Sequence, residues 1–299
     1  MSPQPTAEDH SAPRRLEGRV ALVTGASRGI GKGIAVELGI AGAAVYVTGR
    51  TVDPPGLSEL PGSLAETVQE IQRLGGVGVG LACDHHDDDA VRSVMARIDR
   101  DHGRLDVLVN NVYSSPDLGP WLGRVFWDLP LEVWDQNFDI GVRSHYVASA
   151  LAVPLLERSG GGLIVNVSSP GGGRYLHNVP YGVAKAALDR LSADTAHELA
   201  GRGVTVVSLW PGLTRTEFVT RGRRGMDEGK VDLPEGVIDL SLAETPRFSG
   251  RAVVALAADD QRAERSGRAW PVAELARAYG FTDVDGRVPD IKRGAPPFS

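Results

Sequence analysis

Short apolar runs alternate with longer amphipathic stretches from residue 19 onward. The runs have the length and β-branched content of buried strands, and they lie at residues 19–24, 44–48, 77–83, 105–109, 162–167 and 204–209. The segments between them have helical periodicity, at residues 29–42, 63–74, 87–102, 129–158 and 180–200. Ser63 is the predicted N-cap of one helix, and Asn178 with Pro180 marks the start of another.

Apolar strands of this length, separated by helices, predict parallel strands that are covered on both faces. The expected fold is α/β: a single Rossmann-like, doubly wound parallel sheet with helices on both faces. We expect a flexible N-terminal tail at residues 1–17, one domain over 18–280 and a C-terminal tail at 281–299. Residues 215–246 are charged and weakly periodic, which suggests a mobile substrate flap over the carboxyl edge of the sheet.

Composition excludes several classes of protein. The 299 residues are 42% hydrophobic, which is incompatible with disorder over most of the chain. The net charge is −6 and no long basic run offsets it, so nucleic acid is not an expected partner. Neither a secretion signal nor an apolar run long enough to span a membrane is present. With Cys83 as its single cysteine, the chain suits a reducing compartment, and we expect it to be cytoplasmic.

A glycine-rich turn follows the first predicted strand and opens the first predicted helix. Residues 24–31 read TGASRGIG. Glycines let a backbone turn sharply and approach a pyrophosphate, whose negative charge the helix N-terminus stabilises. The predicted cofactor-binding residues of this turn are Gly25, Ser27, Arg28, Gly29, Ile30 and Gly31.

The spacing of these glycines, with three residues and then one between them, resembles that of the short-chain dehydrogenase/reductase family. The resemblance implies a Rossmann fold that binds a nicotinamide dinucleotide. By position, Asp84 resembles the family's contact to the adenine, Asn110 a contact at the end of the fourth strand, and Thr216 the hydroxyl that holds the carboxamide. Residues 110–113 read NNVY where the family has Asn-Asn-Ala-Gly, a departure on the nicotinamide side.

The end of the second strand indicates which dinucleotide binds. An acidic residue there would hydrogen-bond the ribose 2′-hydroxyl of NAD and repel a 2′-phosphate, but residues 48–51 read TGRT. Arg50 and Arg28 could instead clamp a phosphate. We therefore expect NADP(H). NAD(H) remains the alternative if both arginines are ordinary surface charges.

Tyr181 and Lys185 lie four residues apart and thus on one face of a predicted helix. Hydride arriving at a carbonyl carbon builds negative charge on the oxygen, which a positioned acid must protonate. A free tyrosine has a pKa of about 10, and a neighbouring ammonium favours its ionised form. The family resemblance assigns Tyr181 and Lys185 to catalysis and to the cofactor's ribose, and Ser169 to orientation of the substrate oxygen.

The long predicted helix departs from the family pattern. Many relatives carry an asparagine where this chain has Gly141, and that residue helps to hold a water behind the lysine. Asn137, one helical turn earlier, is a candidate substitute. Several segments place the chain in a subgroup that resembles NADPH-dependent reductases of lipophilic carbonyls, including ring ketones. Its resemblance covers about residues 16–287.

Other features of the sequence have plainer interpretations. Residues 84–89 read DHHDDD, but acidic residues favour a helix start, so we expect no metal site. A small-molecule carbonyl is the expected substrate. The rival functions are a 3-oxoacyl thioester ketoreductase and a catalytically silent dinucleotide sensor. By resemblance the chain forms a homodimer or homotetramer. Aromatic residues that could line an apolar pocket, or pack the core or a subunit contact, are Tyr113, Trp121, Phe126, Trp127, Tyr175 and Phe218.

Overall fold

The computed structural model describes residues 14–54, 60–113, 124–221, 230–233 and 236–289. Its centre is a seven-stranded sheet in the order β3-β2-β1-β4-β5-β6-β9, and neighbouring strands are parallel throughout. The strands are β1 (Val20–Val23), β2 (Ala44–Gly49), β3 (Val77–Ala82), β4 (Val107–Asn110), β5 (Leu163–Val167), β6 (Thr205–Trp210) and β9 (Ala269–Pro271). The predicted α/β class and the doubly wound parallel sheet are confirmed.

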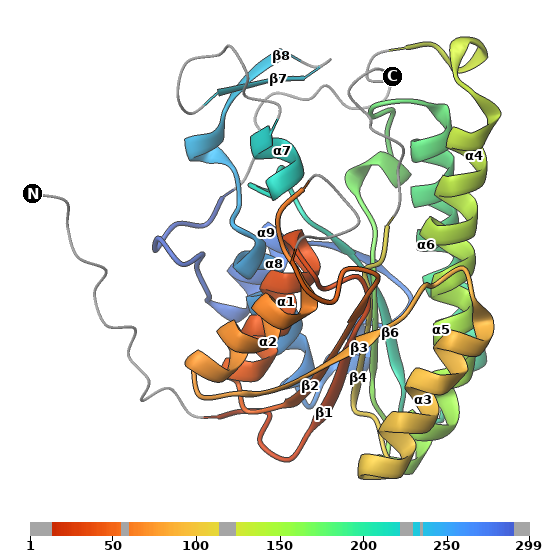
Figure 1. The fold of residues 1–299 in the computed structure, drawn as a ribbon, viewed down its shortest axis with the longest axis vertical. Helices are drawn as coiled ribbons and strands as arrows, with labels where there is room; N and C mark the ends of the chain where they lie inside the picture. The colour runs from red at the N-terminus through yellow and green to blue at the C-terminus, as the bar shows by residue number, and fades with distance from the viewer. Residues whose placement is uncertain (1–13, 55–59, 114–123, 222–229, 234–235, 290–299) are drawn as a thin grey trace, which may run out of the picture.

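Helices cover both faces of the sheet (Figure 1). One layer contains α1 (Gly29–Ile40), α2 (Leu64–Arg73), α8 (Pro246–Ala257) and α9 (Val272–Tyr279). The other contains α3 (Asp88–His102), α4 (Leu131–Phe138), α5 (Ser144–Arg158) and α6 (Val179–Glu198). Among the described residues no helix combines the length and the apolar character that crossing a membrane requires.

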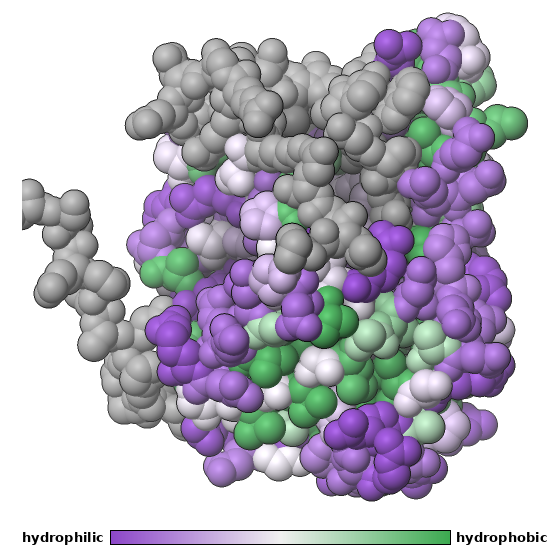
Figure 2. Space-filling model, viewed as in Figure 1, coloured by the Kyte–Doolittle hydropathy of each residue, from purple (hydrophilic) through white to green (hydrophobic). Residues whose placement is uncertain are grey.

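Alternation along the central strands builds the two apolar layers. In β1, Ala21 and Val23 pack into the layer that contains α1 and α8. Val20 and Leu22 face the opposite layer with α3 and α5, because successive side chains of a strand point to opposite faces. The edge strand β3 is less covered, and 60% of Val77 is exposed. Seen from the side shown in Figure 1, the surface has apolar residues gathered in its lower centre, with more polar residues on either side (Figure 2).

Two predicted helix starts are confirmed in atomic detail. Ser63 Oγ accepts a hydrogen bond from Glu66 N, and Asn178 Oδ1 accepts one from Tyr181 N. The long helix expected over residues 129–158 is helical from Leu131 to Arg158, but it is not one regular α-helix. A π-helical turn at Asp139–Arg143 separates α4 from α5, with Gly141 at its centre. Glycine is a poor helix former, which favours such an irregular turn at this position.

Elements beyond residue 210 complete the carboxyl edge of the sheet. The short helix α7 (Glu217–Arg221) and the antiparallel pair β7 (Lys230–Leu233) and β8 (Gly236–Asp239) lie at the top of Figure 1. The strand order reverses between β1 and β4, so their carboxyl ends flank the crevice where ligands bind in such sheets. The sequence patterns did not predict β9, α8 or α9.

Candidate active site

The glycine-rich turn after β1 has a backbone that only glycine accommodates. Gly25 and Gly29 have φ angles of +65° and +59°. A Cβ atom on Gly25 would lie 2.7 Å from Val112 Cα, and one on Gly31 would lie 2.3 Å from Asn111 Nδ2. These close approaches bring the carboxyl ends of β1 and β4 together and leave no space for a side chain on either glycine. The turn therefore presents bare backbone at the N-terminus of α1.

An anion can be accepted at this helix start. Arg28, the N-cap residue of α1, makes no side-chain capping bond. The backbone N–H of Gly29 donates to Glu217 Oε2 over 2.8 Å, so a carboxylate from α7 lies at the positive end of the α1 dipole. The same backbone geometry suits the phosphate oxygens of a dinucleotide. The sequence did not indicate Glu217, because the contact joins residues far apart in the chain.

The two arginines expected to bind a 2′-phosphate lie in different surroundings. Arg28 Nε donates to Pro61 O and Nη2 donates to Gly62 O, each over 2.9 Å. Burial lowers the pKa of Arg28, while the charges of Glu217 and Glu66 act in the opposite direction. Arg50 directly follows β2 and is exposed. The structure thus places one guanidinium on the 61–62 loop and the other in solvent at the strand end.

Ser27, Ile30 and Thr216, which were also predicted to bind the cofactor, lie in or beside the glycine-rich turn. Ser27 approaches the end of β2, because a Cβ on Gly49 would lie 3.8 Å from Ser27 Oγ. The side chain of Ile30 packs against the apolar core, which leaves its backbone as the group that faces the turn. Thr216 adjoins the same turn: its Cγ2 would lie 3.5 Å from a Cβ on Gly29.

Asp84 and Asn110 differ in what they offer to a ligand. Asp84 is exposed directly after β3, and its Oδ1 accepts from the backbone N of His86 over 3.0 Å. Asn110 is fully buried, and its Nδ2 donates to Ser149 Oγ and Asn166 Oδ1 at 2.9 Å each. The amide of Asn110 therefore lies within the sheet and against α5, where it can fix the strand end but does not project into the crevice.

Asn111 secures the glycine-rich turn, a role that the sequence analysis did not assign. Its Nδ2 donates to the carbonyl oxygens of Thr24 and Gly25, both at 2.9 Å. The backbone N–H of Asn111 donates to Thr24 Oγ1, also at 2.9 Å. The crevice between β1 and β4 is thus crosslinked by side-chain hydrogen bonds. A pair of polar residues at a strand end was the available signal.

The serine pair after β5 divides into two roles. Ser168 is buried and donates its hydroxyl to the Lys185 carbonyl over 3.1 Å, which attaches β5 to α6. Ser169 Oγ accepts from Gly171 N over 3.1 Å at the start of a short 3₁₀ turn, Pro170–Gly172. That bond does not use the hydroxyl hydrogen of Ser169. Of the two, Ser169 is better suited to donate to a substrate oxygen.

The first turns of α6 place Tyr181 and Lys185 beside the carboxyl end of β5 and the turn that follows it. A Cβ on Gly171 would lie 2.8 Å from Tyr181 Cε1, so the turn that carries Ser169 packs directly on the phenol ring. Lys185 Nζ lies 5.8 Å from the centroid of that ring and donates to Val167 O over 3.2 Å. Burial lowers the pKa of Lys185 to about 8, opposed by the charge of Asp189. The ammonium is thus charged near neutrality and titrates just above it.

The two departures from the family pattern meet in space. A Cβ on Gly141 would lie 3.8 Å from Tyr113 Cδ2, so the Tyr113 ring lies directly over the π-helical turn. The Tyr113 hydroxyl donates to Asn137 Oδ1 over 3.2 Å. The sequence named Asn137 as a candidate substitute for the missing asparagine, and the structure places it beside Tyr113 rather than alone.

No group of three or more histidine, cysteine, aspartate or glutamate side chains arranged to hold a metal is found within the described ranges. His85, from the DHHDDD segment, is buried and its Nε2 is 2.9 Å from Thr48 Oγ1. Asp87 caps α3 by accepting from Asp89 N and Ala90 N. The acidic run serves the helix start, as the plainer interpretation proposes.

Comparison with known proteins gives consistent matches. The chain matches the family model described as short chain dehydrogenase over residues 19–227. It is 46% identical over 280 residues to Dehydrogenase/reductase SDR family member 1 of Mus musculus, covering 91% of this chain and 85% of that protein. It is 30% identical over 251 residues to a 7alpha-hydroxysteroid dehydrogenase of Clostridium sardiniense, covering 83% and 89%.

Solved structures share the fold. A short-chain type dehydrogenase/reductase from Mycobacterium marinum superposes with a TM-score of 0.69 at 27% identity, covering 86% of this chain and 94% of that one. A metagenomic short-chain oxidoreductase in complex with NADP gives 0.63 at 29% identity, covering 82% and 92%. The family-model match over residues 19–227 spans the glycine-rich turn, the serine pair and the start of α6.

Proposed function

Because this chain belongs to the short chain dehydrogenase family and is therefore an NAD(P)-dependent oxidoreductase, we propose that it uses NADP(H) to interconvert a lipophilic ketone, such as a ring ketone, and its alcohol. One observation carries the proposal. The buried ammonium of Lys185 lies beside the Tyr181 ring, and the turn with Ser169 packs on that ring, all at the carboxyl edge of the sheet. This is where an acid for carbonyl reduction belongs.

The roles of the three side chains follow from their chemistry. When bound, the nicotinamide dinucleotide supplies or accepts the hydride. In the reductive direction Tyr181 gives its hydroxyl proton to the carbonyl oxygen. Lys185⁺ stabilises the phenolate left behind. Ser169 donates its hydroxyl hydrogen to the same oxygen and so orients the substrate.

The phosphate-binding residues support a nicotinamide dinucleotide. The bare backbone of Gly25 and Gly31, and the Gly29 N–H that binds the Glu217 carboxylate, fit a pyrophosphate. We assign the adenosine side to Asp84, Arg50 and Arg28, and the carboxamide side to Thr216. Asn110 acts through its backbone and through the strand end that it holds, because its amide is buried.

A preference for NADP(H) is supported by the residues at the carboxyl end of β2. No carboxylate occurs in residues 48–51, while Arg50 is exposed there and Arg28 lies at the neighbouring turn. Arg50→Ala should weaken NADPH binding about tenfold and leave NADH binding unchanged. Arg190→Ala, an exposed arginine paired with Asp194 on α6, is the matched control. Tighter binding of NADH than of NADPH by the unmodified enzyme would refute the preference.

A lipophilic substrate class is supported by exposed aromatic side chains in segments that follow the strands. Phe126, Trp127, Tyr175 and Phe218 are between 41% and 70% exposed and follow strands or lie in α7. Apolar pockets are lined predominantly by apolar and aromatic side chains, and these rings are available for that role. Trp121 lies outside the described residues. The relative named for 7alpha-hydroxysteroid oxidation acts on a ring alcohol, as its name says.

A screen of NADPH consumption separates the rival functions. We expect turnover with cyclic ketones and little with an acetoacetyl thioester. Preference for the thioester would favour a 3-oxoacyl thioester ketoreductase instead. NADPH binding without turnover on any ketone or aldehyde would favour a silent dinucleotide sensor.

The domain scheme and the assembly are part of the same proposal. We propose that residues 18–280 act as one domain between terminal segments, with residues 215–246 as a substrate flap. In support, α7 and the β7–β8 pair lie at the carboxyl edge of the sheet (Figure 1). A homodimer or homotetramer is the expected assembly, and light scattering would test it.

A further inference from the structure

Tyr113 stands at the end of a backbone segment that is held from two sides. Thr24 Oγ1 accepts from Asn111 N over 2.9 Å and from Val112 N over 3.1 Å. His145 Nε2 lies 3.1 Å from the Val112 carbonyl oxygen. A carbonyl only accepts, so Nε2 carries the hydrogen. The backbone that precedes Tyr113 is therefore held in place by hydrogen bonds.

The Tyr113 side chain is anchored on the helix layer opposite. Its hydroxyl donates to Asn137 Oδ1 over 3.2 Å, and Asn137 is only 1% exposed. Asn137 Nδ2 donates to Val133 O over 2.7 Å, which fixes the orientation of the amide. Gly141 leaves room for the ring, since even a Cβ there would be in van der Waals contact with it. A larger side chain at position 141 would compete with the ring for this space.

The anchored ring faces the catalytic pair. Lys185 Nζ lies 5.1 Å from the centroid of the Tyr113 ring. The rings of Tyr113 and Tyr181 meet edge to face, with centroids 6.3 Å apart and an interplanar angle of 89°. An aromatic face within about 6 Å attracts an ammonium, most strongly where water is excluded. Lys185 is 8% exposed, and among the described residues its ammonium donates to the neutral carbonyl of Val167, so the contact with the ring contributes to stabilising its charge.

We propose that Tyr113 is a positioning residue of the reaction: its ring, anchored through Asn137, holds the charged form of Lys185 beside Tyr181. The inference rests on the proposed function, because it takes from there the roles of Lys185 and Tyr181. In this role Tyr113 takes no part in the proton transfer between Tyr181 and the substrate. It acts on the phenol through the ammonium that the phenol needs.

The other groups that face Lys185 leave this role to Tyr113. Asp189 favours the charged ammonium from one turn farther along α6, but its Oδ1 also accepts from Ser208 Oγ and Trp210 Nε1. His145 on α5 is neutral near pH 7, because burial lowers its pKa to about 3, with the charge of Lys185 acting in the same direction. The face of Tyr113 thus adds a stabilising contact that Asp189 alone does not supply.

Two substitutions distinguish the contribution of the Tyr113 ring from that of its hydrogen bond to Asn137. Tyr113→Leu keeps apolar bulk but removes the aromatic face, and we expect kcat to fall roughly tenfold to thirtyfold. The alkaline limb of the pH profile should move to lower pH, because Lys185 then loses its proton more easily. Tyr113→Phe keeps the face and loses the anchor, so a fall of about threefold is expected. Tyr146→Leu, at an exposed tyrosine of α5, is the matched control and should leave kcat unchanged.

A second readout does not depend on turnover. Tyrosines isotope-labelled at Cζ report ionisation by NMR, and Tyr181→Phe identifies the resonance of Tyr181. In Tyr113→Leu, and less in Tyr113→Phe, Tyr181 should ionise at higher pH than in the unmodified chain. If that shift occurs while the unmodified chain reduces no carbonyl, the positioning role stands and the proposed function fails.

Two results would overturn the inference. The first is a Tyr113→Leu variant with unchanged kcat and pH profile and a raised KM alone, which would make Tyr113 a pocket wall. The second is an unchanged Tyr181 titration in both variants. Should Tyr113→Leu not fold, as judged by circular dichroism, the Tyr113→Phe titration decides between the same outcomes.

Discussion

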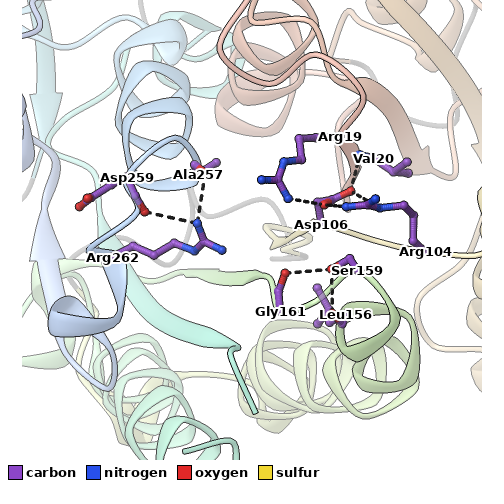
Figure 3. A network of polar contacts seen from close by, with 10 residues as sticks. All are labelled: Arg19, Val20, Arg104, Asp106, Leu156, Ser159, Gly161, Ala257, Asp259 and Arg262. Carbon is purple, nitrogen blue, oxygen red and sulfur yellow. Dashed lines mark hydrogen bonds and ion pairs between the residues drawn. The ribbon is translucent and has the colours of Figure 1, made fainter. Parts of the chain in front are cut away.

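The amino and carboxyl edges of the central sheet treat buried charge in opposite ways. At the amino edge, Asp106 lies before β4 and is 4% exposed, with Arg19 Nη1 and Val20 N donating to its two oxygens over 2.9 Å (Figure 3). Arg104 donates to both oxygens as well. At the carboxyl edge, the buried ammonium of Lys185 makes one hydrogen bond to the part of the chain that the structure describes, and its acceptor is the carbonyl of Val167.

This difference separates stability from activity. Burial acts to raise the pKa of Asp106, but the hydrogen bonds from Arg104 and Arg19 outweigh it and hold the pKa below its ordinary value. At the carboxyl edge burial dominates, and it lowers the pKa of Lys185 to about 8. Buried atoms that have no hydrogen-bond partner among the described residues, including Asn110 Oδ1 and His145 Nδ1, also lie near this site. The amino edge is built for stability, and the carboxyl edge gives up stability for a group that can change its charge.

Removing the charge at the carboxyl edge should give the largest effect. Lys185→Met is expected to lower kcat by about 100-fold to 10,000-fold, because the Tyr181 phenolate loses its stabilising cation. Its melting temperature should stay the same or rise, since an apolar side chain replaces a poorly paired buried charge. Steady-state kinetics and thermal unfolding of the same samples measure both. A clear fall in melting temperature would contradict the conclusion that the buried charge of Lys185 lowers stability.

The corresponding substitution at the amino edge should lower the stability of the protein and leave its activity unchanged. Asp106→Ala leaves Arg19 and Arg104 without their carboxylate, and we expect a loss of about 3 kcal/mol of unfolding free energy. The value of kcat, measured well below the melting temperature, should remain that of the unmodified enzyme. The exposed Arg158–Asp99 pair provides the control, and Asp99→Asn should change the stability little.

Acid should act on the amino edge with a defined sign. The folded-state pKa of Asp106 is lowered, so its stabilising contribution is present above the unfolded value of about 3.9. That contribution is lost as the pH falls through the lowered folded value. Denaturant titrations at several acidic pH values should show a smaller pH dependence for Asp106→Ala.

Alkali should move the two properties of Lys185 in opposite directions. As the pH rises through about 8, the folded ammonium loses its proton and carbonyl reduction slows. Between about 8 and the unfolded value of about 10.4, the unfolded chain binds more protons, so this group's contribution to stability rises with pH. The measurement is kcat and unfolding free energy over one pH series. If the unfolding free energy of Lys185→Met rises with pH as much as that of the unmodified chain, the rise belongs to another group.

The smallest expected effect concerns Glu217. Its carboxylate occupies the Gly29 N–H and must leave for a phosphate to bind there. Glu217→Gln removes the negative charge that opposes a dinucleotide, so NADPH should bind about threefold to tenfold more tightly. Fluorescence titration of NADPH measures this. Weaker binding by the variant would indicate that Glu217 assists the cofactor rather than competing with it.

The sequence predicted those parts of the fold that local patterns encode. Six apolar runs marked six of the seven parallel strands, and polar caps marked the starts of α2 and α6. The seventh strand, Ala269–Pro271, has three half-buried residues and no run to recognise. The π-helical turn at Gly141 was not predicted either. It leaves no mark in the hydrophobic periodicity, and its contact with Tyr113 is visible only in the fold.

The candidate site divides along the same line. Tyr181 and Lys185 were predicted as a pair because residues four apart lie on one face of a helix, and the structure places both on α6. The sequence did not indicate Glu217, and it did not show that the amide of Asn110 bonds to Asn166, because these contacts join distant segments. Tyr113 and Gly141 were visible as separate departures from a family pattern. Only the fold shows that they are neighbours.

The measurement that tests the account most directly is a single-turnover experiment on Tyr181→Phe. NADPH oxidation is followed with a reducible cyclic ketone in excess, and NADPH binding is measured on the same protein. The account predicts that the rate of hydride transfer falls by at least about 100-fold while the NADPH dissociation constant is unchanged. A Tyr181→Phe enzyme that oxidises NADPH at the unmodified rate would contradict it.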